Sequence, residues 1–108
     1  MEEKRLAQSQ IANGSQTTLY TLAADTTTVF KTIIITNTTS SDATVSIWDV
    51  QNGDSYGDGN AIVNDLNVPA NDFVQIITYL IFDTAGDALL AEAGTASAIT
   101  ISAYGAEV

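Results

Sequence analysis

Hydrophobic and polar positions fall into short stretches along this chain, and polar turns separate the stretches. The segment Lys31–Val50, KTIIITNTTSSDATVSIWDV, contains two of them. The run Ile33–Ile35 is β-branched without interruption, which is typical of a strand buried on both faces. After the turn, Val45 and Ile47 alternate with polar or outward-facing positions, which indicates a strand with one solvated face. The pattern predicts a hairpin at the centre of a sheet.

Similar stretches recur along the rest of the chain. Further strands are expected at Thr17–Leu22, Ala61–Val68, Phe73–Phe82 and Ala98–Tyr104. The run Phe73–Phe82 is almost wholly apolar and is interpreted as a second central strand. Gln51–Asn60, rich in Gly, Asp and Asn, is expected to be a loop. Ala88–Ala93 (ALLAEA) is the one piece with a helix-like composition.

This spacing of strands and turns predicts the fold class. About seven to eight short strands, with turn signals every 8–12 residues or so, are typical of a sandwich or barrel. Long amphipathic helices, which a βαβ chain would need, are not indicated. We therefore expect an all-β protein: a single, jelly-roll-like β-sandwich of antiparallel strands spanning residues 16–108.

Residues 1–15 differ in composition from the remainder. Lys4 and Arg5 are two of the three basic residues, and the apolar anchors Leu6 and Ile11 are sparse. Asn13-Gly14 is expected to break the chain. The segment is either a frayed first strand or an arm that packs on a neighbouring acidic copy. In the second interpretation Lys4, Arg5, Leu6 and Ile11 are candidate interface residues.

Charge excludes some partners. The formal net charge is −10, from 13 acidic and 3 basic residues. Nucleic-acid affinity comes mainly from Lys and Arg, so we expect no nucleic-acid partner. Anionic membranes are disfavoured for the same reason, and no apolar stretch is long enough to span a bilayer. No secretory signal is visible, so synthesis is expected in the cytoplasm of the host.

Candidate chemistry is scarce. The chain has neither His nor Cys, which removes the usual general base, the thiol nucleophile and the zinc ligands. The aspartates stand mainly at turns, where Asp is common for conformational reasons. Asp54, Asp58 and Asn60 could ligate Ca²⁺, but their spacing is not that of an EF-hand. We predict no catalytic residue, no cofactor and no metal site.

Trp48 is a further candidate interface residue. Since Val45 and Ile47 are expected to face the core, alternation turns Trp48 toward the other face of its sheet. There it could bind a ligand such as a sugar, pack under a loop, or lie in a subunit interface. Interface burial is favoured, because Trp is enriched at interface centres.

Three segments in order carry a family resemblance: LYTLAADTTTVFKTIIITNTTSSDATVSIWDV, NVPANDFVQI and GDALLAEAGTASAITISAYGAEV. Together they resemble small β-sandwich virion proteins of tailed bacteriophages, in which a "LYTVPAGTTTVV" opening, an "ITNTT" turn, a "PAN" turn and a "TISG" ending recur. The resemblance covers Leu19–Val108. The chain departs from it at Ala24-Asp25, where Pro-Ala-Gly would be expected, and at Tyr104 near the closing Gly105.

The resemblance implies a non-enzymatic structural component of the virion. The first expectation is a capsid decoration, or cement, protein that forms a homo-oligomer, expected to be a trimer, on the major capsid protein. One alternative is an adaptor associated with the tail, baseplate or fibre. From a different class, the alternative is a carbohydrate-binding β-sandwich module.

Overall fold

The computed structural model describes residues 2–11 and 16–108, and these residues form strands and a single turn of 3-10 helix. The strands are β1 (Glu2–Gln10), β2 (Thr17–Thr21), β3 (Thr28–Asn37), β4 (Ala43–Val50), β5 (Ala61–Val68), β6 (Phe73–Phe82), β7 (Ala88–Ala93) and β8 (Ile99–Glu107). The 3-10 turn, η1 (Asp58–Asn60), lies in the loop between β4 and β5. The expected break at Asn13-Gly14 lies outside the described residues.

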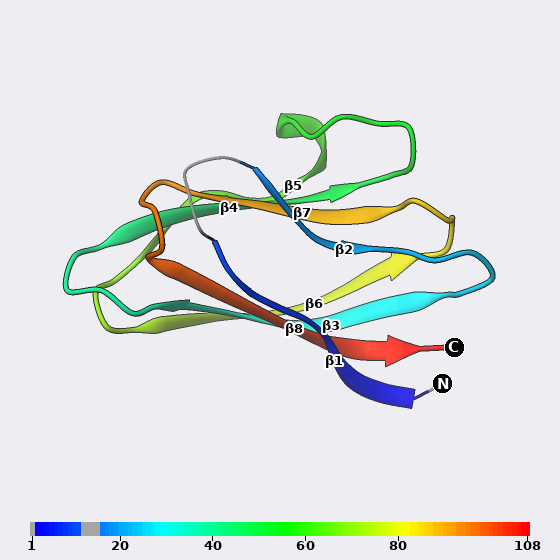
Figure 1. Ribbon diagram of the computed structural model, residues 1–108, viewed down its shortest axis with the longest axis horizontal. Helices are drawn as coiled ribbons and strands as arrows, with labels where there is room; N and C mark the ends of the chain where they lie inside the picture. The colour runs from blue at the N-terminus through cyan, green and yellow to red at the C-terminus, as the bar shows by residue number, and fades with distance from the viewer. Residues whose placement is uncertain (1, 12–15) are drawn as a thin grey trace.

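The strands form two four-stranded sheets that stack as the layers of a sandwich (Figure 1). Sheet A has the order β1-β8-β3-β6 and sheet B the order β2-β7-β4-β5. All pairings are antiparallel, and they include β1 with β8, β2 with β7, β3 with β6 and β4 with β5. The chain is thus one long hairpin, with its tip between β4 and β5, rolled into two layers. This is jelly-roll topology, so the predicted fold class is confirmed.

The predicted hairpin at Lys31–Val50 is wrong in one respect. Its two strands are β3 and β4, and they lie in different sheets. Asn37, which is 1% exposed, explains how the chain crosses. Its Nδ2 donates to the carbonyl oxygens of Ser41, at 2.8 Å, and Val68, at 3.0 Å, and its Oδ1 accepts from the Thr39 N–H at 3.0 Å. One buried amide therefore holds the end of sheet A to the start of sheet B.

The core fills the space between the sheets, and it includes Val45 and Ile47, as alternation predicted, together with two residues of the isoleucine run. Ile33 and Ile35 from β3 and Val45 and Ile47 from β4 are at most 1% exposed. Other fully buried side chains come from both layers: Ile11, Phe30, Val68, Phe82, Leu89, Ile99 and Ile101. Burial of such side chains stabilises the fold by about 1.5–3 kcal/mol each.

The helix-like segment ALLAEA is strand β7, between β2 and β4 in sheet B. Its Leu89 is 0% exposed and faces the core, and its Leu90 is 8% exposed and packs with Trp48 on the outer side. Helix propensity differs by only a few tenths of a kcal/mol per residue, so burial of two leucines on opposite faces outweighs it.

The N-terminal segment is part of sheet A over its described length. β1 pairs with β8 from Glu2↔Glu107 to Gln10↔Thr100. As a result the start of β1 and the end of β8 lie side by side at one end of the sandwich (Figure 1).

Candidate interaction surface

Strand β6 presents a row of exposed apolar side chains. Phe73 is 57% exposed, Ile77 81%, Tyr79 68% and Ile81 53%. The residues between them are more buried, so exposure alternates along the strand with the period of two that a pleated strand imposes. We call the outward residues Phe73, Gln75, Ile77, Tyr79 and Ile81 the β6 stripe.

The sequence interpretation of β6 as a central strand is wrong: β6 is the edge of sheet A and pairs with β3 alone among the described strands. The inward residues Val74, Ile76 and Leu80 pack against the core, and Phe82 is part of it. Because most of the residues on the outward face are also apolar, the sequence pattern predicted a strand buried on both faces. An unbroken apolar run does not separate a central strand from an edge strand with an exposed apolar face.

The β6 edge also has unpaired backbone groups. The Asn37 N–H donates to the Asp72 carbonyl oxygen at 2.9 Å, which continues the pairing of Thr36 with Phe73. In an antiparallel ladder, alternate residues bond to the neighbouring strand and those between them point the other way. Phe73, Gln75 and Ile77 therefore direct N–H and C=O away from β3. The Asp72 carboxylate accepts the Phe73 N–H at 2.7 Å, consistent with this direction.

The other three edges carry features that discourage pairing. β1 begins with Glu2-Glu3-Lys4-Arg5, and charged side chains protect edge strands. β2 has only 5 residues. β5 contains Asp65 at φ 51°, and its register with β4 shifts twice. β6, in contrast, has 10 residues and neither a charge nor a proline. It is the long, apolar edge that natural sheets usually avoid.

The predicted interface residues of the N-terminal segment have different surroundings. The Lys4 Nζ lies 2.9 Å from the Glu107 Oε1, and this hydrogen bond and charge pair raises the pKa of Lys4. Leu6 packs against the core. Ile11 is 0% exposed, and its N–H donates to the Ile99 carbonyl oxygen at 2.8 Å. Arg5 is exposed. In the folded monomer, Arg5 and the 45% exposed Lys4 remain accessible to a neighbour, whereas Leu6 and Ile11 pack in or against the core.

Glu107 joins four strands at this end of the sandwich. Its Oε2 accepts from the Tyr20 hydroxyl at 2.7 Å and from the Thr28 hydroxyl at 3.2 Å, while its Oε1 pairs with Lys4. The bonds from Tyr20 and Lys4 lower the pKa of the Glu107 carboxyl. Burial raises the pKa of the Tyr20 hydroxyl. These contacts connect β1, β3 and β8 of sheet A to β2 of sheet B. The pKa shifts of Glu107 and Tyr20 are therefore explained by burial and by contacts that hold the two sheets together.

Trp48 points to the outer face of sheet B, as alternation predicted, where it is 6% exposed. The loop between β4 and β5 covers it: the Tyr56 ring lies 4.6 Å from the Trp48 ring, centroid to centroid, at 55°. Of the three environments considered for Trp48, this structure shows packing under a loop. The tryptophan face is not open to a sugar.

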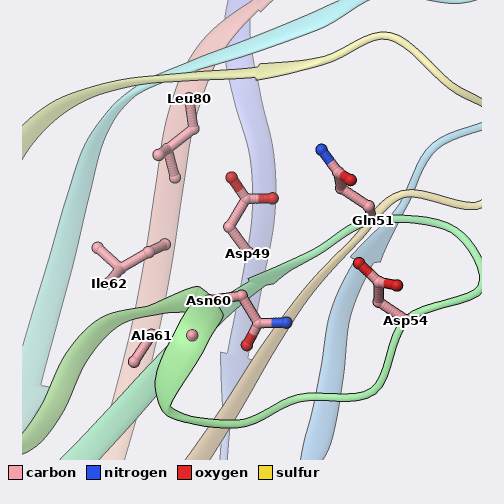
Figure 2. Close-up of a pocket in the computed structure, with 8 residues that line it drawn as sticks. Asp49, Gln51, Asp54, Asn60, Ala61, Ile62 and Leu80 are labelled. Carbon is pink, nitrogen blue, oxygen red and sulfur yellow. The ribbon is translucent and has the colours of Figure 1, made fainter.

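A polar hollow of about 560 Å³ opens beside this loop (Figure 2). Asp49, Gln51, Asp54 and Asn60 line it on the polar side, and Ile62 and Leu80 on the apolar side. Burial, and then the charge of Asp87, raise the pKa of the Asp49 carboxyl. Asp54 and Asn60 share this hollow, but the third proposed calcium ligand, Asp58, does not line it. In the described ranges, no three acidic residues are grouped closely enough to hold a metal.

Replacing Asp49 by asparagine is expected to stabilise the protein at pH 7. Because the folded-state pKa of Asp49 is raised, ionisation of this half-buried carboxyl opposes folding above that pKa. The effect disappears as the pH falls through the folded-state pKa toward the unfolded value of about 3.9. Urea unfolding of both proteins at pH 7 and at pH 4 measures this. Asp58→Asn, at an exposed aspartate in the same loop, is the control. Equal midpoints for Asp49→Asn and wild type at pH 7 would contradict the expectation.

No helix in the described ranges is long and apolar enough to cross a membrane. The sequence matches no protein-family model and no curated protein.

Among solved structures, the chain is similar to one in the structure of infectious bursal disease virus Gx strain, with a TM-score of 0.49, 14% identity, and coverage of 98% of this chain and 30% of that chain. The Gt strain of the same virus gives a TM-score of 0.47 and 12% identity, covering 98% and 32%. A tobacco streak virus coat protein dimer gives 0.45 and 12%, covering 94% and 80%. The chain spans less than a third of the infectious bursal disease virus chains. All three neighbours are viral structures.

Proposed function

We propose that this protein is a non-enzymatic structural component of a virus particle: a capsid decoration protein that adds to the shell through contacts between copies and with the shell protein. The observation that carries the proposal is the β6 stripe. Monomeric soluble proteins rarely expose contiguous apolar patches larger than a few hundred Å², and a row of exposed apolar side chains on one strand is typical of an interaction surface. The jelly roll is also an architecture that viral capsid subunits use, and the segments from Leu19 to Val108 resemble phage virion proteins.

Charge explains why the contact would form at this surface. Copies with a net charge of −10 repel one another wherever carboxylates come close. The β6 stripe has no charged residue, so a partner can approach it without desolvating an ion. A specific contact hides on the order of 1,600 Å² in total. Many weak contacts on one particle then reinforce each other through effective concentration. Arg5, exposed on β1, is a second candidate contact with an acidic neighbour.

The number of copies per particle tests this function. Virus particles purified from the source culture would be counted by quantitative mass spectrometry against a labelled standard of this chain. A decoration protein is expected at many copies, on the order of hundreds, because it follows the symmetry of the whole shell. Copy numbers of three, six or twelve would instead favour the tail, baseplate or fibre adaptor. Absence from the particles would overturn the virion role itself.

The polar hollow favours one second candidate, a carbohydrate-binding module. Carboxylate and amide groups such as those of Asp49, Gln51 and Asn60 can hydrogen-bond sugar hydroxyls. The aromatic platform expected for such a site is covered, however, since Trp48 lies under Tyr56. A glycan array tests this alternative, and a decoration protein is expected to bind none of the glycans.

A further inference from the structure

We propose that two copies of this chain pair their β6 strands antiparallel across a two-fold axis, which joins two four-stranded sheets A into one continuous sheet. The pairing deepens the proposed function, on which it rests for its biological setting, by naming a second copy as the partner along the β6 edge. The two can fail separately: a chain found on particles that never dimerises would overturn the pairing alone.

Backbone geometry restricts how the edges can meet. Identical strands related by a two-fold axis run antiparallel, and the contact is complete with two copies. Gln75 and Ile77 direct N–H and C=O away from β3, whereas the Phe73 N–H already donates to Asp72 at 2.7 Å. In one register, the unpaired N–H and C=O groups of Gln75 bond to those of Ile77 in the second copy. In this register the two-fold axis passes beside Ile76, and the two copies form four backbone hydrogen bonds.

Side chains support the same register. With Gln75 opposite Ile77, Phe73 lies at the end of the ladder, beside the Thr78-Tyr79 bulge of the second copy, and the same contact recurs across the axis. Aromatic contacts between neighbouring strands are among the stabilising ones. The pairing also places Ile77, which is 81% exposed in the monomer, beside Gln75 of the second copy on the outer face of the joined sheet.

The ladder ends where β6 changes. The register of β6 with β3 shifts between Phe30 and Thr32, where β6 carries the extra residue in Thr78-Tyr79. A bulge bends its strand and disrupts pairing beyond it. The paired segment is therefore short, and we expect a reversible dimer that dissociates at roughly micromolar concentration.

Sedimentation of the purified chain tests the dimer. Wild type is expected to show a monomer–dimer equilibrium, and Ile77→Glu to raise the dissociation constant at least tenfold, because two carboxylates would face the axis. Ile77 is so exposed that the fold should survive, which circular dichroism would verify. Val108→Glu, an exposed apolar residue changed in the same way, is the matched control. A wild type that is monomeric at all concentrations up to about 1 mM, or a trimer, would overturn the proposal, because an isologous contact closes at two.

Cysteine cross-linking tests the register, since the native chain has no cysteine. Gln75→Cys and Ile77→Cys are mixed, oxidised and run on a non-reducing gel. A hydrogen-bonded pair has its Cα atoms about 5.5 Å apart, within the range of a disulfide. The mixture is expected to form a covalent dimer in several-fold excess over either variant alone. Efficient cross-linking of Gln75→Cys alone, or of Ile77→Cys alone, would place the axis on that residue and overturn the register. No cross-link in any sample would overturn the edge pairing.

Discussion

Replacement of Phe30 by alanine is expected to lower the free energy of unfolding by about 4 kcal/mol, because it removes a fully buried aromatic ring and leaves a cavity. Phe30 is 0% exposed. Its ring centroid lies 5.0 Å from that of Phe82 and 5.2 Å from that of Tyr20, both in edge-on contact. These rings come from both sheets, so the loss loosens the sandwich at the end that Glu107 also holds together.

Urea unfolding followed by tryptophan fluorescence measures the change. Phe73→Ala is the matched control: it removes the same ring from a position that is 57% exposed. At protein concentrations low enough to keep the chain monomeric, Phe73→Ala is expected to change stability by less than about 0.5 kcal/mol. If both variants lost the same stability, the inward and outward faces assigned to sheet A would be wrong.

Replacement of Gly105 by alanine is expected to cost about 3 kcal/mol, near the upper end for overpacked sites. Gly105 pairs with Phe30 in the centre of sheet A. A Cβ placed on it would overlap the Val29 carbonyl oxygen, and the Phe30 Cα would lie only 3.0 Å away. Both obstacles are backbone atoms of a central strand, which cannot move aside without breaking the ladder.

Thermal unfolding gives the readout for this second change. A loss of about 3 kcal/mol lowers the Tm of a domain of this size by at least roughly 10 °C. Gly57→Ala is the control, because nothing lies within 4 Å of the position that its Cβ would take, and its backbone, at φ 176°, is extended. Similar melting temperatures for Gly105→Ala and Gly57→Ala would show that β3 and β8 are not as close as described.

The sequence predicted well those features that depend on one strand at a time. Alternation placed Val45 and Ile47 in the core and turned Trp48 outward, and the structure agrees for all three. The facing of a side chain follows from the pleat of its own strand, so a local pattern contains that information. The number and approximate bounds of the strands follow from turn chemistry, which is also local.

Features that depend on distant segments were not predictable in this way. β3 and β4 read as a hairpin because they are adjacent in sequence, yet Asn37 directs the chain to the other sheet through a contact with Val68. β6 read as central because its outward residues are apolar. Whether a strand lies in the centre or at the edge of a sheet depends on the order of the strands, and the residue pattern within one strand does not contain this information. The candidate interaction surface was missed for this reason, whereas Ile11 was proposed as a contact residue although the core contains it.

The nesting of the strand pairs has a consequence for synthesis of the chain. Among the described strands, β4 and β5 are the only two that are both consecutive and paired, so assembly along the chain would begin there and add β3 with β6, β2 with β7 and β1 with β8 outward from that tip. β8 lies between β1 and β3 and is one of the two interior strands of sheet A. Sheet A therefore remains incomplete until β8, the last strand, has left the ribosome. Before then the β3 edge and the β6 stripe are both uncovered on a nascent chain. Successive ribosomes on one mRNA would bring such nascent chains close together. The β6 edge, which is proposed to pair with a second copy, would then also favour premature association.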